Sequence, residues 1–203
     1  MTNADHKPDR ALSADGIAAA ARSATKKGPP PVHLWDPPFC GDLDMRVARD
    51  GTWFYLGTPI GRRALVKLFA SVLKREGDAY FLVTPVEKVG IKVDDAPFVA
   101  VDFTVQGAGE TLVLTFTTNV DDVAEAGEAH PIRMSIDPET GEPAPYILIR
   151  RNLEALIDRK SFYRLVDLGT EREVDGVAWF GILSGGVFFP FMPVAELQGL
   201  TNG

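Results

Sequence analysis

Residues 40–69 read CGDLDMRVARDGTWFYLGTPIGRRALVKLF, and this stretch decides the fold of the first half of the chain. Residues 44–49 and 52–57 have the composition of two strands, with Asp50-Gly51 between them. An Asp-Gly pair between two such runs is a strong signal of a β-hairpin. The sequence therefore predicts a hairpin that turns at residues 50–51.

A helix is predicted directly after this hairpin. The Thr58 side chain can accept a hydrogen bond from a free backbone N–H, and Pro59 has the φ angle that the first helical position requires. Apolar residues then recur at helical spacing, at Leu65, Leu68, Phe69, Val72 and Leu73. Residues 76–78 (Glu-Gly-Asp) end the predicted helix.

The rest of the chain alternates strands with short helices. Apolar patterns predict strands at residues 80–84, 86–93, 98–105, 111–118, 132–136, 146–149, 177–183 and 187–191. Helices are predicted from Arg150 onward and over residues 161–168. The start of the first helix, Arg62-Arg63, matches Arg150-Arg151 in the second half. The sequence thus predicts an α+β fold of duplicated antiparallel β-sheet units, each with one main helix.

We expect three segments along the chain. Residues 1–28 form a flexible, basic leader with a weak alanine-rich helix at residues 13–22, and the prolines that follow form a linker. Residues 29–96 are expected to form an N-terminal α+β domain. Residues 97–203 are expected to form a C-terminal α+β domain, after a boundary at Asp94-Asp95-Ala96-Pro97.

The composition excludes several classes of protein. A formal net charge of −7 over 203 residues argues against a broad nucleic-acid-binding surface. Cys40 is the only cysteine, which excludes an internal disulfide and fits a reducing compartment. No apolar run approaches the roughly 20 residues of a transmembrane helix. We expect a cytoplasmic protein that binds neither membranes nor nucleic acid.

Arginines at predicted helix starts are the first candidate site. Arg62 and Arg63 stand where the helix dipole disfavours a cation. A bound phosphate or carboxylate would offset this cost, since guanidinium and free N–H groups both bind anions. Ion pairs with nearby carboxylates, or solvent exposure, are the alternative. Arg150 has the equivalent place in the second half.

Two carboxylates form a second candidate site. Asp42 and Asp44 are two residues apart on a predicted strand, so they share one side of it with Arg46. They could ligate a divalent cation, or they could form ion pairs with Arg46. Two carboxylates without a nucleophile or a third ligand are weak grounds for catalysis.

A third candidate site is the segment that holds Thr84, Glu87 and Lys88, near the predicted domain boundary. Ligand sites are often found at domain interfaces. We expect these residues to supply hydrogen bonds to a ligand, and a bend with a surface ion pair is the alternative.

No motif of the chain indicates a cofactor. His6, His33 and His130 are too far apart in the sequence to predict a zinc site. Residues 57–62 lack the Lys-Ser/Thr ending of a phosphate-binding loop. Ser184 lacks the preceding glycine of a nucleophile elbow.

Several short blocks together resemble a bacterial family, the domain of unknown function 1285. They are WDPP at 35–38, GDLDMR at 41–46, DGTW at 50–53, GTPIGR at 57–62, LVTPVEK at 82–88 and DDAPF at 94–98. The resemblance implies an internally duplicated α+β fold whose second half is pleckstrin-homology-like. It also implies a pocket between the two halves for a nucleotide-type ligand, and a role in signalling under oxidative stress.

We therefore expect a ligand-sensing signalling module that binds an anionic, nucleotide-type small molecule between its domains and acts on an unidentified protein partner. The expected ligand-binding residues are Asp44, Arg46, Arg62, Arg63, Thr84, Glu87, Lys88 and Arg150. No catalytic residue, cofactor or metal is expected. The alternatives are a metal-dependent enzyme acting on a nucleotide-like or phosphorylated substrate, with Asp42 and Asp44 as metal ligands, and a protein-interaction module without a ligand.

Overall fold

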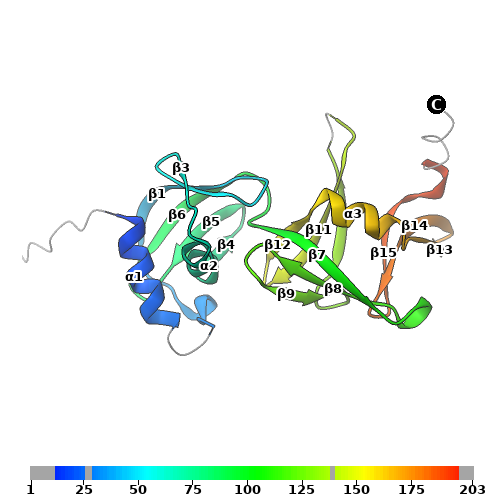
Figure 1. Ribbon diagram of the computed structural model, residues 1–203, viewed down its shortest axis with the longest axis horizontal. Coiled ribbons are helices and arrows are strands. Elements are labelled where there is room, and N and C mark those ends of the chain that lie inside the picture. Colours follow the sequence, from blue (N-terminus) through cyan, green and yellow to red (C-terminus); the bar gives the residue numbers. More distant parts are fainter. Residues whose placement is uncertain (1–11, 26–28, 138–139, 197–203) are drawn as a thin grey trace, which may run out of the picture. The chain divides into compact units, whose positions relative to one another are not determined.

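The computed structural model describes residues 12–25, 29–137 and 140–196 (Figure 1). The chain divides into two compact units, the first of Met1–Arg46 and Trp53–Lys92 and the second of Val47–Thr52 and Val93–Gly203. The helices are α1 (Ala14–Thr25), α2 (Arg63–Ser71) and α3 (Arg159–Val166), with the 3-10 helices η1 (Val32–Leu34) and η2 (Gly109–Thr111). The strands form three sheets.

The first sheet has six strands in the order β3-β2-β1-β6-β5-β4. Its strands are β1 (Phe39–Val47), β2 (Trp53–Tyr55), β3 (Thr58–Pro59), β4 (Leu73–Glu76), β5 (Ala79–Val83) and β6 (Lys88–Val93). At its centre, Lys88 N donates to Pro38 O (3.2 Å), and Asp94 N donates to Val47 O (3.0 Å). Both strands advance in the same direction between these bonds, so β1 and β6 are parallel.

The second sheet repeats this plan with the order β10-β11-β12-β7-β8-β9. Its strands are β7 (Phe98–Gln106), β8 (Val113–Thr118), β9 (Val123–Glu125), β10 (Ile132–Ile136), β11 (Pro143–Arg150) and β12 (Leu153–Ile157). The first strand, β7, again pairs in parallel with the last, β12. Each sheet thus consists of two three-stranded meanders joined through their first and last strands. The predicted α+β fold of duplicated sheet units is confirmed.

A third, three-stranded sheet completes the second unit. Its strands are β13 (Thr170–Val174), β14 (Val177–Ser184) and β15 (Val187–Pro193), in that order. The buried Ser184 hydroxyl accepts a hydrogen bond from Leu114 N (2.9 Å) and donates one to Ala126 O (2.7 Å). Ser184 therefore links this sheet to β8 and to the residue that follows β9.

The predicted helix start at Thr58-Pro59 is wrong. Leu56 and Gly57 both have positive φ angles, of 49° and 73°. Positive φ at both central residues is the conformation of a two-residue hairpin turn. The turn brings Thr58 opposite Tyr55, so residues 58–59 form β3. Helix α2 begins only at Arg63 and ends at Ser71, before the predicted stop.

The helix predicted from Arg150 is also wrong. Arg151 has a φ of 53° in the turn after β11, and the chain then continues as strand β12. Leu153, Ala155 and Ile157 alternate as buried positions, which is the spacing of a strand. The second predicted helix is present as α3.

The expectation of a flexible leader is corrected for residues 14–25, which form a packed helix. In α1 the side chains of Ile17, Ala18 and Ala21 are buried, and the helix contacts α2. Small alanine side chains allow this close approach. Residues 1–11 and 26–28 lie outside the described residues, and that part of the prediction stays untested.

The turn at Leu56 generates a stability prediction. An L-residue pays roughly 1–2 kcal/mol for the left-handed conformation, whereas asparagine adopts it more easily. Replacing the exposed Leu56 with asparagine should raise the free energy of unfolding by about 1 kcal/mol, measured by urea denaturation. The same replacement at the exposed Leu34, which has no positive φ, is the control. Equal effects at both sites would contradict the conformational explanation.

Candidate functional site

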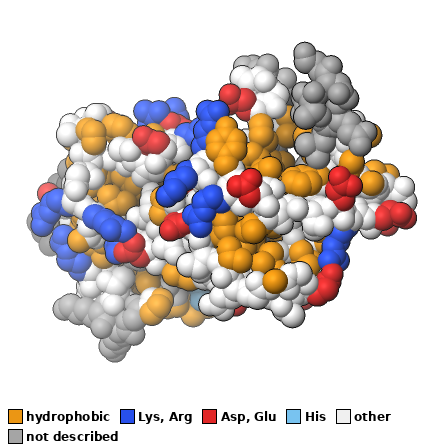
Figure 2. All heavy atoms as spheres, turned by 45° about the vertical axis from the view of Figure 1, so that its right-hand side comes forward, with side chains coloured by type: hydrophobic (Ala, Val, Ile, Leu, Met, Phe, Trp, Pro, Cys, Tyr) orange, Lys and Arg blue, Asp and Glu red, His pale blue; other side chains and the backbone are white. Residues whose placement is uncertain are grey.

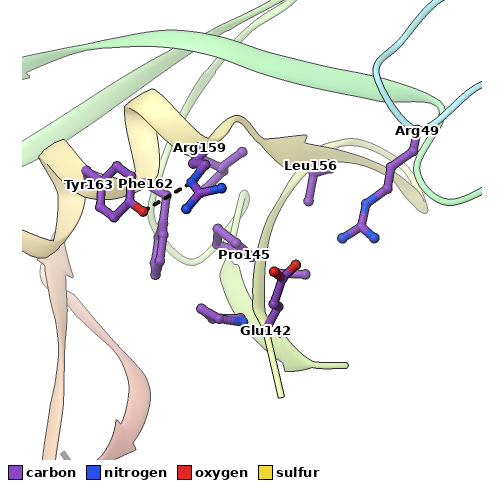
Figure 3. Close-up of a pocket in the computed structure, with 10 residues that line it drawn as sticks. Arg49, Glu142, Pro145, Leu156, Arg159, Phe162 and Tyr163 are labelled. Carbon is purple, nitrogen blue, oxygen red and sulfur yellow. Dashed lines mark hydrogen bonds between the residues drawn. The ribbon is translucent and has the colours of Figure 1, made fainter. Parts of the chain in front are cut away.

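A cavity of about 370 Å³ in the second unit is the candidate site (Figure 3). Strands β11 and β12 and helix α3 form its walls, and Glu142, just before β11, and Arg49, in the turn after β1, complete it. The lining residues are Arg49, Glu142, Pro143, Ala144, Pro145, Leu156, Ile157, Arg159, Phe162 and Tyr163. The cavity therefore combines an apolar wall with charged groups.

Arg49 is held in place by the turn and by an aspartate. The Asn119 side chain donates to Gly51 O (3.3 Å) and accepts from Val99 N (3.1 Å), so it fastens the turn to β7. Arg49 Nε lies 3.2 Å from Asp95 Oδ2, an ion pair by distance rather than an aligned hydrogen bond. These contacts leave the outer part of the guanidinium group directed toward the cavity (Figure 3).

Asp95 is itself positioned by a tyrosine. The Tyr146 hydroxyl donates to Asp95 Oδ1 at 2.8 Å. Burial, together with this hydrogen bond, raises the pKa of Tyr146 to about 12. The phenol therefore keeps its proton at neutral pH and remains a donor to the carboxylate that pairs with Arg49.

Arg159 faces the cavity from the first turn of α3. The Asp158 carboxylate caps this helix by accepting from Ser161 N at 2.7 Å. Arg159 Nε donates to the Tyr163 hydroxyl at 3.1 Å, and this hydrogen bond raises the pKa of Arg159. Its terminal nitrogens point into the hollow, as Figure 3 shows.

Glu142 lies between the two guanidinium groups in the view of Figure 3. The arrangement can bind an anionic group through Arg49 and Arg159, which suit carboxylates and phosphates. Glu142 can accept a hydrogen bond from a donor on the same molecule, and Leu156 and Phe162 can pack against its apolar part. Within the described residues, no group of three or more His, Cys, Asp or Glu side chains is placed to hold a metal ion.

Two family profiles match nearly all of the folded chain. Residues 30–96 match the N-terminal domain of DUF1285, described as a domain of unknown function, and residues 97–191 match the C-terminal domain of DUF1285, described as a protein of unknown function. The chain belongs to the DUF1285 family. The predicted resemblance to this family is confirmed.

One solved structure of the DUF1285 family agrees with this assignment. A family protein from Silicibacter pomeroyi DSS-3 is 67% identical, with a TM-score of 0.82 over 92% of this chain and 100% of that one. A family protein from Shewanella baltica OS155 is 30% identical, with a TM-score of 0.49 over 62% of this chain and 91% of that one. No curated protein matched the chain.

Among the helices that the structure describes in this DUF1285 chain, none combines the length and the hydropathy of a transmembrane span.

The first group of expected ligand-binding residues lies on β1. Asp44 and Arg46 are both exposed on one side of the strand, as the two-residue spacing predicted. With Asp42 and Lys92 they border an open hollow of about 400 Å³ in the first unit. The Arg46 guanidinium also lies 5.7 Å from the centre of the Phe54 ring.

The expected arginines at helix starts have different surroundings. Arg62 is the N-cap residue of α2 and Arg63 is its first residue, and both are exposed. Arg150 is instead the last residue of β11, where it pairs with Asp122 and lies 4.9 Å from the centre of the Phe98 ring. Burial lowers the pKa of the Arg150 guanidinium and raises that of the Asp122 carboxyl.

The remaining expected residues have structural contacts. The buried Thr84 hydroxyl accepts from the N–H of Glu87 (3.2 Å) and donates to its carbonyl (3.3 Å), which closes the turn between β5 and β6. Lys88 Nζ lies 3.0 Å from Glu76 Oε2 and 5.0 Å from the centre of the Phe81 ring. None of the expected ligand-binding residues lines the 370 Å³ cavity.

The sequence interpretation missed Arg49, Glu142 and Arg159. One signal for Arg159 was available, since Asp158 followed by Arg159-Lys160 is a cap residue before a basic helix start. The argument made for Arg62 applies equally to this start. No local signal marks Arg49 or Glu142, because only the fold brings these two segments together.

The pairing of Glu76 generates a pH prediction. Hydrogen bonds from Lys74 and Lys88 hold the pKa of Glu76 below its usual 4.5. A lowered pKa stabilises the fold above pH 4.5, and this contribution is lost as the pH falls through the folded-state value. Glu76→Gln should therefore cost about 0.5 kcal/mol at neutral pH, a modest amount because the pair is partly solvated.

Urea denaturation at a series of pH values checks this prediction. The difference between wild type and Glu76→Gln should shrink below pH 4.5, where the unfolded carboxyl also takes up its proton. Glu128→Gln, at an exposed position, is the matched control. A difference that does not depend on pH would contradict the role assigned to the ion pairs.

Proposed function

We propose that this DUF1285 chain is a ligand-sensing module that binds a small anionic molecule in the 370 Å³ cavity of its second unit. The observation that carries the proposal is the convergence of Arg49 and Arg159 on one hollow. One residue comes from a turn and the other from a helix start, and each has its Nε engaged by a neighbouring side chain. Two guanidinium groups held in this way are prepared to bind a carboxylate or a phosphate.

The size and lining of the cavity support binding of a metabolite rather than of a bare ion. Small-molecule sites are concave, largely apolar and usually about 300–1,000 Å³. Leu156, Phe162 and the proline walls would contact the apolar part of the ligand, and Glu142 would accept from a hydroxyl or an amine. A nucleotide, the form expected from the sequence, is one member of this class.

We assign the module to cytoplasmic signalling. The single cysteine, Cys40, is exposed, which suits a compartment that keeps thiols reduced. In this proposal ligand binding alters a surface that a protein partner recognises. An enzymatic role is not part of the proposal, because Glu142 and Tyr163, the lining residues that could transfer a proton, have no Ser, Cys or His in the same lining with which to form a nucleophile–base pair.

Binding measurements on single variants test this function. The probes are nucleoside monophosphates, dicarboxylates and sugar phosphates, screened first by thermal shift and then measured by calorimetry. Arg159→Gln and Arg49→Gln should each weaken binding of a stabilising anion about tenfold or more, since each removes a hydrogen bond to a charged group.

Lys160→Gln is the matched control, because it removes a positive charge from the same helix at a residue that does not line the cavity. Arg62→Gln, measured in the same screen, tests the site in the first unit that the sequence suggested. Equal losses for Lys160→Gln and Arg159→Gln would refute a specific anion site. A loss confined to Arg62→Gln would move the site to the first unit.

A further inference from the structure

A second hollow, of about 220 Å³, opens beside the charged cavity in the second unit. It lies among β10, β14, β15 and the C-terminal part of α3. Its lining residues are Met134, Ile136, Gly141, Pro143, Phe162, Val166, Phe180, Phe191 and Met192. No side chain in this lining carries a polar group other than the methionine sulfurs, so we call this hollow the apolar groove.

The apolar groove and the charged cavity adjoin each other. Pro143 and Phe162 line both of them. The Phe162 ring extends from α3 along the wall of the cavity in Figure 3, and its centre lies 6.4 Å from that of Phe191, which lines the groove. A ligand that fills the cavity can therefore continue past Phe162 into the groove.

One face of helix α3 changes from charged to apolar along its length, in parallel with the change from the charged cavity to the apolar groove. Arg159, Phe162, Tyr163 and Val166 are spaced three and four residues apart, so they lie on one side of the helix. The charged residue is at the N-terminal end of this face, and Val166 is at the C-terminal end. The face thus changes from anion-binding to apolar over two turns.

We propose that the anionic ligand of this protein is a free, single-chain amphiphile. Its headgroup pairs with Arg49 and Arg159, and its hydrocarbon chain lies in the apolar groove. The inference rests on the proposed function and narrows its ligand class. A nucleobase fits the groove poorly, because the polar edges of the base would be buried without hydrogen-bond partners.

The exposure of the groove residues supports a hydrocarbon occupant. Ile136 is 48% exposed and Val166 is 37% exposed, although both are apolar. Figure 2 shows hydrophobic side chains gathered in patches on the face of the second unit, bordered by acidic groups. An alkyl chain would remove this apolar surface from water. The arginines at the other end select a ligand with a negative headgroup.

Chain-length dependence is the direct test. The full chain is titrated by calorimetry with acetate, butyrate, hexanoate, octanoate and decanoate, each below the concentration at which it forms micelles. Affinity should rise about fourfold for each added methylene that enters the groove. Octylamine, with the opposite headgroup charge, should bind at least tenfold more weakly than octanoate.

Variants of the groove distinguish the contribution of the hydrocarbon chain to affinity from that of the headgroup. Ile136→Glu and Val166→Glu place a carboxylate at partly exposed groove positions, so they should fold and should abolish the gain from octanoate to decanoate. Val123→Glu is the control, since Val123 is 61% exposed and lines neither hollow. Arg159→Gln should weaken all long-chain carboxylates by a common factor without changing the gain per methylene.

The outcomes distinguish the two proposals. The affinity for carboxylates could be independent of chain length while nucleotides or dicarboxylates bind through Arg159. That result would overturn the proposal of an amphiphilic ligand and would leave the proposed anion-binding function standing. If no anion of any kind binds, both are overturned. If octylamine binds as tightly as octanoate, the groove takes a tail but the assigned headgroup recognition is wrong. Loss of decanoate binding in Val123→Glu would also count against the groove.

Discussion

Each unit of this protein depends on the pairing of its first strand with its last. Hairpins of neighbouring strands build two meanders, and only the parallel contacts of β1 with β6 and of β7 with β12 join them into one sheet. These contacts join strands that lie far apart in the sequence, so their formation carries a substantial entropic cost of loop closure. In the second unit the same pairing positions β12, from which the chain enters α3 and places Arg159 at the cavity.

Local signals in the sequence predicted two of the hairpin turns that contain glycine. The hairpins at Asp50-Gly51 and Gly185-Gly186 were predicted at the right places. The two wrongly predicted helix starts occur where Leu56 and Arg151 adopt positive φ angles. Neither residue favours that conformation, so strand pairing imposes it against local preference. A prediction based only on the residues of the turn cannot identify a turn that strand pairing imposes.

The candidate site was less predictable than the fold, for a related reason. Sequence reasoning compared neighbours along the chain and chose residues such as Arg62 and Thr84, which have local roles at a helix start and in a turn. The cavity combines Arg49 and Arg159 from segments that only the fold brings together. The physical argument for an anion at a basic helix start applies to α3, although the sequence interpretation placed it elsewhere. Membership of the DUF1285 family supports the fold, but it does not identify a ligand or a reaction.

The hydrogen bond from Asn119 to Gly51 couples substitutions at two positions that are distant in the sequence. A Cβ atom on residue 51 would lie only 2.5 Å from Asn119 Nδ2. Any side chain at position 51 therefore requires a smaller or displaced residue at position 119, which would remove the hydrogen bonds that hold the turn. The effect of a substitution at position 51 therefore depends on which side chain occupies position 119.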